Sequence, residues 1–406
     1  MIPTGHSRGF VKSRLERLRT TLTGHVEQGG VPGLVALVAR GDEVHVEALG
    51  VRSVGGGPVT RDTLFRVASM TKPVTAVAAM ILLEECRLRL DDPVDELLPE
   101  LADRQVLRHL DGPLDDTVPA RRSITVRDLL TFRLGTGIVA GPPGGYPIQR
   151  AMAALELGQG LPSPALVPAP DEWLRRLGTL PLMYQPGERW AYHTGSDVLG
   201  VLIARAVGRP FEEFLRERLF APLGMTSTAF SVTPDRLDRF ATAYRGDPAT
   251  GTLAVQDEAA GGGWSAPPAF ASGGAGLVST VDDFHAFSRM LLDGGRYDGE
   301  RILSRASVEL LTTDQLTPEQ KATSGLGPGF FDAQGWGFGV SVATRRTELG
   351  HPVGQFGWNG GFGTSWAVDP ADRVIGVLLT QRLFTSAEAP PVVQDFWTST
   401  YQALAD

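Results

Sequence analysis

The residues best suited to covalent chemistry are a serine and a lysine in the segment 67–73 (VASMTKP). The apolar pattern after Ser69 predicts a helix, and residues three apart share one helix face, so Lys72 can approach the Ser69 hydroxyl. A serine hydroxyl needs a base, and a lysine can serve only when burial or nearby cations lower its pKa. N–H groups at the helix start could bind a developing oxyanion. Taken alone, the spacing also fits a helix-capping serine beside a solvated lysine.

A second candidate lies in the segment 185–196 (QPGERWAYHTGS), where a turn delivers Tyr192 just before a predicted helix. A phenol close to a lysine ammonium is expected to have a lowered pKa and could act as general base or proton relay. The alternative is a core tyrosine with a hydrogen-bonded hydroxyl. We expect His193 to be only a neighbour of the site, because successive residues need not face the same way.

A third candidate is the glycine-rich segment 357–364 (GWNGGFGT), which precedes a predicted strand. Glycines allow a backbone to approach a substrate closely. The N–H of Gly361 could therefore be a second oxyanion donor beside that of Ser69. A glycine-rich hairpin loop without a catalytic role remains the alternative.

In this order, the three segments resemble the class C β-lactamase family and its relatives, most of all the family VIII carboxylesterases. The resemblance implies that Ser69 is the nucleophile, that Lys72 activates it, and that Tyr192 shares in proton transfer. It also implies oxyanion donors at Ser69 and Gly361, and no cofactor. Further stretches extend the resemblance from about residue 30 to about residue 385: LDDPV at 90–94, ITVRDLLT at 124–131, LFAPLGM at 219–225, GAGLVST at 274–280 and WAVDP at 366–370.

Two departures from the family pattern bear on the substrate. Thr194 stands where the tyrosine motif usually has asparagine, an amide that contacts substrate and lysine. Trp358-Asn359-Gly360 stands where β-lactamases and peptidases have Lys-Thr-Gly or His-x-Gly, so the cation that holds a substrate carboxylate is missing. The indole resembles the esterase branch and favours neutral, hydrophobic esters. We expect Trp358, Asn359, Gly360 and Thr194 to contact the substrate.

Strand patterns occur near both ends of the chain, and helical patterns fill the middle. Strands are predicted at 33–39, 43–49, 337–343, 363–368 and 374–380. Because regular βαβ alternation is absent, a doubly wound parallel sheet is disfavoured. We expect an α+β fold of the β-lactamase/D,D-peptidase type, in which both termini build one antiparallel sheet flanked by helices. The predicted domains are a sheet domain (1–75 and 275–406) and a mainly helical domain (76–274), with the site in the cleft between them.

Composition excludes several classes of function. The 406 residues carry a net charge of −8, which argues against nucleic-acid binding. No apolar run is long enough for a membrane span, and no leader pattern is seen at the N-terminus, so a cytoplasmic location is expected. The histidine spacings do not suggest a metal site, and Cys86 is expected to be buried. Oligomeric state is left open.

The segment 5–9 (GHSRG) matches the Gly-x-Ser-x-Gly elbow of another hydrolase fold. That motif needs a strand before the serine, and too few residues precede it here. A catalytic role for Ser7 is therefore rejected.

The sequence predicts a carboxylesterase-type serine hydrolase that cleaves a small-molecule ester through an acyl-Ser69 intermediate. A β-lactamase, a D-amino-acid amidase or peptidase, or an acyltransferase could use the same Ser69, Lys72 and Tyr192. A non-catalytic binding protein of the same fold is the alternative from a different class.

Overall fold

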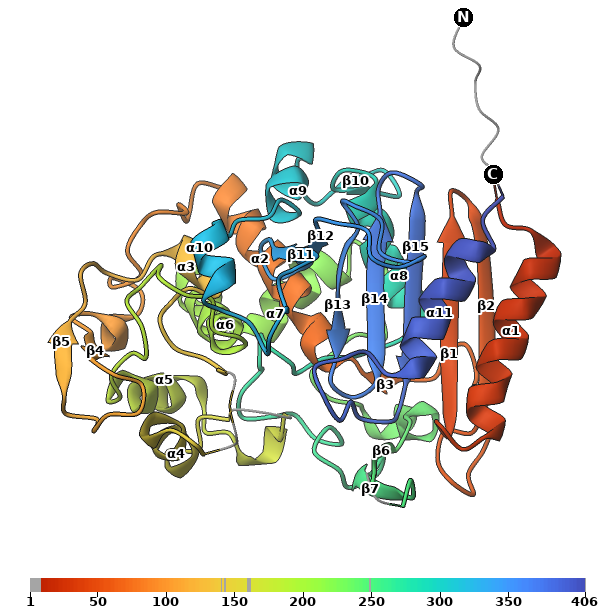
Figure 1. Ribbon diagram of the computed structural model, residues 1–406, viewed down its shortest axis with the longest axis horizontal. Helices are drawn as coiled ribbons and strands as arrows, with labels where there is room; N and C mark the ends of the chain where they lie inside the picture. The colour runs from red at the N-terminus through yellow and green to blue at the C-terminus, as the bar shows by residue number, and fades with distance from the viewer. Residues whose placement is uncertain (1–8, 140, 142–143, 159–161, 248–249, 406) are drawn as a thin grey trace, which may run out of the picture.

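A seven-stranded antiparallel sheet organises the computed structural model, which describes residues 9–139, 141, 144–158, 162–247 and 250–405. As predicted, both ends of the chain build one sheet, in which two strands come from the start of the chain and five from its end. Figure 1 shows this sheet beside a larger, mostly helical part of the chain. In spatial order the strands are β11 (Gln334–Trp336), β12 (Ser341–Ala343), β13 (Phe356–Gly360), β14 (Thr364–Asp369), β15 (Val374–Thr380), β1 (Gly33–Arg40) and β2 (Glu43–Gly50).

The strand β1 is apolar on both sides because the sheet is covered on both faces. Successive side chains of a strand point to opposite faces. Leu34, Ala36 and Val38 pack with the terminal helices α1 (Lys12–Glu27) and α11 (Pro391–Gln402). The alternate residues of β1 join the main core on the other face, where α8 (Val281–Leu292) packs. The first and last helices of the chain therefore lie side by side on one face of the sheet (Figure 1).

The remaining helices and short strands lie mostly between the two groups of sheet strands in sequence. The helices are α2 (Thr71–Glu84), α3 (Val126–Leu130), α4 (Pro147–Ala154), α5 (Pro170–Gly178), α6 (Thr194–Val207), α7 (Phe211–Leu215), α9 (Arg305–Leu311) and α10 (Pro318–Ala322). The short strands are β3 (Phe65–Arg66), β4 (Gln105–Leu107), β5 (Thr117–Pro119), β6 (Ala243–Gly246), β7 (Leu253–Asp257), β8 (Val278–Ser279), β9 (Arg296–Tyr297) and β10 (Glu300–Arg301).

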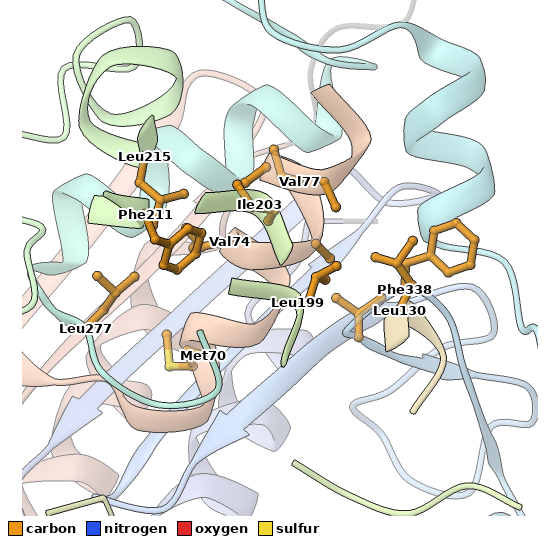
Figure 2. Close-up of a cluster of buried hydrophobic side chains, with 14 of the residues drawn as sticks. Met70, Val74, Val77, Leu130, Leu199, Ile203, Phe211, Leu215, Leu277 and Phe338 are labelled. Atoms are coloured by element: carbon orange, nitrogen blue, oxygen red, sulfur yellow. The ribbon is translucent and has the colours of Figure 1, made fainter. Parts of the chain in front are cut away.

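Two of these helices, α2 and α6, run through the core and contact each other. Figure 2 shows Val74 and Val77 of α2 close to Leu199 and Ile203 of α6, within one cluster of buried side chains. A helix that is apolar on most of its circumference belongs in a protein interior. The starts of both helices are thus fixed by packing around them.

The structure differs from the sequence predictions in a few elements. The segment 337–343 forms a strand only at its end, as β12. The glycine-rich third motif precedes the strand β14, as predicted, but residues 356–360 also form a strand, β13, which was not expected. Cys86 is exposed, which contradicts the expectation of a buried thiol; it lies just beyond α2 with a φ of 56°.

The predicted domain boundary at residue 75 falls inside α2, and the division into two domains stays a prediction. Among the described residues, no helix has the length and apolar character needed to cross a membrane. Ser7, the serine of the rejected elbow motif, lies outside the described residues.

Candidate active site

Ser69 lies in a single 3₁₀ turn, Ala68–Met70, that leads directly into α2. The strand β3 and the loop before it bring the chain to this turn, where Val67 N–H donates to Leu277 O at 3.0 Å. Ala68 has a φ of 44°, a conformation that non-glycine residues rarely adopt. Ser69 is half-buried between the buried Ala68 and Met70. Ser69 is therefore the partly accessible residue of an otherwise buried turn.

Lys72, on the first turn of α2, is fully buried with 0% of its surface exposed. Its Nζ lies 3.1 Å from Ser69 Oγ and 3.2 Å from His193 Nδ1, and it donates to Gly274 O at 2.6 Å. Burial lowers the pKa of Lys72 to about 7, although the charge of Asp197 opposes this shift. A lysine with that pKa is neutral for much of the time near pH 7 and can accept a proton from serine.

Tyr192 lies against Lys72, whose Nζ is 4.5 Å from the centre of the phenol ring. The phenol oxygen accepts a hydrogen bond of 2.6 Å from Trp358 Nε1 on β13. Burial raises the pKa of Tyr192, and its hydrogen bonds with Ser69 and Trp358 offset only part of this rise. The expectation of a lowered pKa was therefore wrong, because desolvation of the buried phenol dominates. As a neutral phenol, Tyr192 can relay a proton but is a poor resident base.

His193, expected to be only a neighbour, contacts Lys72 directly. It is the central residue of a γ-turn: Thr194 N–H donates to Tyr192 O at 3.1 Å, and His193 has φ 82° and ψ −64°. This form of the turn is rare and strained for a residue with a side chain. The sharp turn allows Tyr192 and His193, although successive, to contact the same lysine.

Asp197, one helical turn further along α6, holds the other side of the His193 ring. Its Oδ2 lies 3.0 Å from His193 Nε2. Its Oδ1 accepts from Ser272 Oγ at 2.6 Å and from Gly274 N–H at 3.0 Å. Burial alone would raise the pKa of Asp197, but His193, Ser272 and Lys72 together hold that pKa below its usual value. A buried carboxylate is thus kept charged by its partners.

The predicted second oxyanion donor follows β13, which packs against the nucleophile turn. At Gly360 a Cβ atom would come within 2.2 Å of Val67 O, so this contact requires glycine. Thr364 Oγ1, at the start of β14, donates to the same carbonyl at 3.3 Å. Gly361 is therefore held beside the turn that carries Ser69, as an oxyanion site needs.

Asn359 and Thr194 were also expected to contact the substrate. Asn359 pairs across the strands with Ser365, which faces α11 and accepts from Trp397 Nε1 at 3.0 Å. Because side chains alternate along a strand, Asn359 points away from the face that carries Trp358. Thr194 is buried at the start of α6. The structure therefore brings together Ser69, Lys72, Tyr192, Trp358 and the Gly360–Gly361 backbone, but not the side chain of Asn359; a substrate contact of Thr194 stays a prediction.

The model of the Beta-lactamase family matches residues 18–393, nearly the whole chain. The chain belongs to the beta-lactamase family. This family membership agrees with the fold, the antiparallel sheet built from both termini and the order of the three motifs.

Relatives within the beta-lactamase family include esterases. The chain is 42% identical over 362 residues to Uncharacterized protein MT1414 of Mycobacterium tuberculosis, covering 87% of each chain. It is 31% identical to Esterase EstB of Burkholderia gladioli, covering 88% of each. Among solved structures it is similar to EstCE1, a hydrolase with promiscuous acyltransferase activity, with a TM-score of 0.78 and 26% identity over 96% of this chain and 99% of that one. The family is therefore one of serine hydrolases with esterase and acyltransferase members.

Sequence reasoning missed the pair His193 and Asp197. One signal was available: a histidine and an aspartate four residues apart at the start of a predicted helix face the same side. The γ-turn that directs His193 toward Lys72 has no comparable sequence signature, since strained backbone of this kind is stabilised by its surroundings.

Proposed function

We propose that this protein is a carboxylesterase that works through an acyl-Ser69 intermediate. The observation that carries the proposal is the buried Lys72 amine, 3.1 Å from Ser69 Oγ and with a pKa lowered to about 7 by burial. A base of this kind is what a serine nucleophile requires near neutral pH. The esterases among the relatives support the same activity.

Acylation proceeds from this geometry in two steps. As Ser69 Oγ bonds to the ester carbonyl carbon, its proton moves to the neutral Lys72 Nζ. The carbonyl oxygen takes up the negative charge, which the N–H groups of Ser69 and Gly361 stabilise. When the tetrahedral intermediate collapses, the C–O bond to the alcohol breaks. The proton held by Lys72 then reaches the leaving oxygen through the Tyr192 hydroxyl.

Deacylation repeats the sequence with water. Water attacks the acyl carbon, gives its proton to Lys72 and releases the acid, while Ser69 recovers its proton. Tyr192 is held in place for both steps by Trp358 Nε1 at 2.6 Å.

The preference for esters over β-lactams is part of the proposal. The side chain at position 358 is an uncharged indole, and its N–H is already donated to Tyr192. It therefore offers no charge-assisted bond to a substrate carboxylate. Neutral acyl groups fit this site better than substrates that carry a carboxylate beside the scissile bond.

The test is a panel of short-chain p-nitrophenyl esters, a p-nitroanilide and nitrocefin, each run with the wild type and with Ser69→Ala. We expect ester turnover that Ser69→Ala abolishes, and an acyl adduct that peptide mass mapping places on Ser69. Full ester activity in Ser69→Ala would contradict the proposal. Nitrocefin turnover above ester turnover would favour a β-lactamase, and stable acylation without turnover a binding protein.

Acyl transfer is a second candidate, supported by the likeness to EstCE1 with its promiscuous acyltransferase activity. An alcohol would take the place of water in deacylation. Added alcohol that raises p-nitrophenol release and yields a new ester would support this activity. The cytoplasmic location remains a prediction.

A further inference from the structure

We propose that His193, held by Asp197, is a positioning residue that aims the lone pair of neutral Lys72 at the Ser69 hydroxyl. This inference rests on the proposed function, since it assumes that Lys72 is the base. It concerns residues to which the family motifs assign no role: His193 is the middle position of Tyr-x-Asn, and Asp197 lies outside that motif.

The atoms around Lys72 Nζ restrict where its N–H bonds and its lone pair can point. Three groups lie within hydrogen-bond distance: Ser69 Oγ at 3.1 Å, His193 Nδ1 at 3.2 Å and Gly274 O at 2.6 Å. A neutral amine has two N–H bonds and one lone pair. A carbonyl oxygen can only accept, so Gly274 takes one N–H. If His193 Nδ1 takes the other, the lone pair is left for Ser69.

Asp197 decides whether His193 Nδ1 can accept. A charged carboxylate is an acceptor only, so the ring nitrogen beside it, Nε2, must carry the hydrogen. The other nitrogen of a neutral imidazole, Nδ1, then has a free lone pair that faces Lys72. Because Ser272 Oγ and Gly274 N–H both donate to Asp197 Oδ1, the carboxylate is itself fixed in orientation.

The other charged and titratable groups around His193 leave this assignment intact. Lys72 and Asp197 face its two ring nitrogens, and the neutral Tyr192 precedes it in the chain. Glu156 lines a cavity of about 340 Å³ that His193 and Asp197 also line, but its side chain is 61% exposed and pairs with Arg176 at 2.8 Å. Burial lowers the pKa of His193, and Lys72 lowers it further while Asp197 opposes, so the ring stays neutral.

The backbone on both sides of the His193 ring is shaped so that the ring can contact Lys72. The strained γ-turn places the ring between α2 and α6, at φ 82° for a residue that is not glycine. On the other side, a Cβ atom at Gly274 would come within about 3.1 Å of the His193 ring and of Asp197 Oδ1. Strain of this kind persists only where the surrounding structure holds it, and it gathers at functional sites.

His193 keeps the same protonation state throughout the reaction. When Ser69 Oγ bonds to an acyl carbon, its proton goes to Lys72, which becomes an ammonium whose N–H groups still meet Gly274 O and His193 Nδ1. His193 keeps its proton on Nε2 throughout and passes none on. It acts through Lys72 and does not touch the substrate.

The experiment compares His193→Leu, His193→Asn and Asp197→Asn in the full-length protein. Asparagine tolerates positive φ, and its Oδ1 can replace Nδ1 as an acceptor. The measurement is the rate at which a fluorophosphonate probe labels Ser69 between pH 5 and 10. The probe reports serine reactivity whatever the natural substrate is, because Ser69 Oγ displaces fluoride from phosphorus. Thermal unfolding of each variant is recorded beside it.

We expect His193→Leu to label roughly 100-fold more slowly, the range for a misplaced general base, and His193→Asn to stay within about tenfold of the wild type. Asp197→Asn should label slowly, because its amide can donate to Nε2 and reverse the tautomer. Wild-type labelling in His193→Leu, or equal loss in the Leu and Asn variants, overturns the inference. A wild type whose Ser69 the probe does not label overturns the proposed function as well.

Because His193→Leu could fail to fold, a second measurement uses the wild type alone. Nitrogen-15 NMR of histidine-labelled protein, with His193 assigned from the His193→Asn spectrum, reports which ring nitrogen carries hydrogen. We expect hydrogen on Nε2 alone from pH 6 to 9. Hydrogen on Nδ1, or a doubly protonated ring in that range, overturns the inference and leaves the proposed function standing.

Discussion

Two buried helices meet at the candidate site, and they deliver their residues in different ways. A non-glycine residue with positive φ precedes each helix: Ala68, at 44°, begins the 3₁₀ turn that leads into α2, and His193, at 82°, comes directly before α6. At the start of α2, Ser69 of the preceding 3₁₀ turn and Lys72 come together because they are only three residues apart. In α6, His193 meets a lysine 121 residues away in the sequence. The first pair is local, whereas the second contact exists only once the core has packed.

Charge also distinguishes the two helix starts. The start of α2 carries a buried amine, and the start of α6 carries a buried carboxylate, Asp197. Neither is paired directly with the other, because His193 lies between them. An amine paired directly with a carboxylate would be held as an ammonium, which cannot accept a proton. The intervening imidazole lets burial lower the pKa of Lys72 despite the anion nearby.

The largest expected effect comes from the nucleophile on the α2 side. Ser69→Ala should lower ester kcat by about 10³-fold or more, since no other group forms the acyl intermediate. The measurement is p-nitrophenyl ester hydrolysis. Ser7→Ala, in the rejected elbow motif, is the matched control and should keep wild-type activity. Full activity in Ser69→Ala together with lost activity in Ser7→Ala would instead identify Ser7 as the nucleophile.

The next effect tests the amine. Lys72→Met preserves length and apolar stem but removes the base, so kcat/KM should fall roughly 10²- to 10⁴-fold. In the wild type, kcat/KM should decline as pH falls below about 7, where Lys72 is protonated. The exposed Lys12→Met, on α1, is the control and should show neither change.

Lys72→Met also tests the burial of the amine, through the way in which the stability of the folded chain depends on pH. The pKa of Lys72 is about 7 in the folded chain against an ordinary 10.5, so the unfolded chain binds more protons between these values. Stability should therefore rise with pH through that window, while below pH 7 the cost of the buried charge remains in full. Lys72→Met should flatten the rise in Tm between pH 7 and 9.5. An unchanged slope would mean that the amine is not buried as described.

A smaller effect tests the close approach of β13 to the nucleophile turn. Gly360→Ala adds a Cβ that would lie 2.2 Å from Val67 O and from Thr364 Oγ1. We expect a loss of about 1–3 kcal/mol in stability, with a lower kcat because Gly361 moves from the oxyanion position. Gly327→Ala is the control, since a Cβ there meets no atom within 4 Å. Equal stability and equal kcat in the two variants would show that the close approach of β13 to the nucleophile turn does not require glycine at position 360.

The smallest expected effect concerns the hydrogen bond from Trp358 on β13 to Tyr192, which lies just before α6. Trp358→Phe removes the N–H bond to Tyr192, and a bond worth about 1 kcal/mol corresponds to roughly a fivefold loss in kcat. Trp366 is its cross-strand partner and donates to Ser288 Oγ at the same 2.6 Å. Trp366→Phe should therefore lower Tm but leave kcat/KM unchanged. If both variants lose activity alike, the indole at 358 acts through folding.

Much of the fold followed from local patterns. The strands β1 and β15 and the helices α2 and α6 were predictable because apolar periodicity over a whole element is a local property of sequence. The strand β13 was missed because its glycines and Asn359 are typical of loops. Its strand conformation comes from pairing with β12 and β14, which are formed by other parts of the chain.

The sequence by itself determined the order of the motifs, the Ser69–Lys72 spacing and the indole at position 358. These depend on residue identity and on the short-range geometry of a helix. Only the tertiary structure decided that Lys72 is fully buried, that the pKa of Tyr192 is raised, and that His193 and Asp197 reach the amine. Desolvation and the direction of a side chain depend on what packs around a group, and those neighbours come from distant segments.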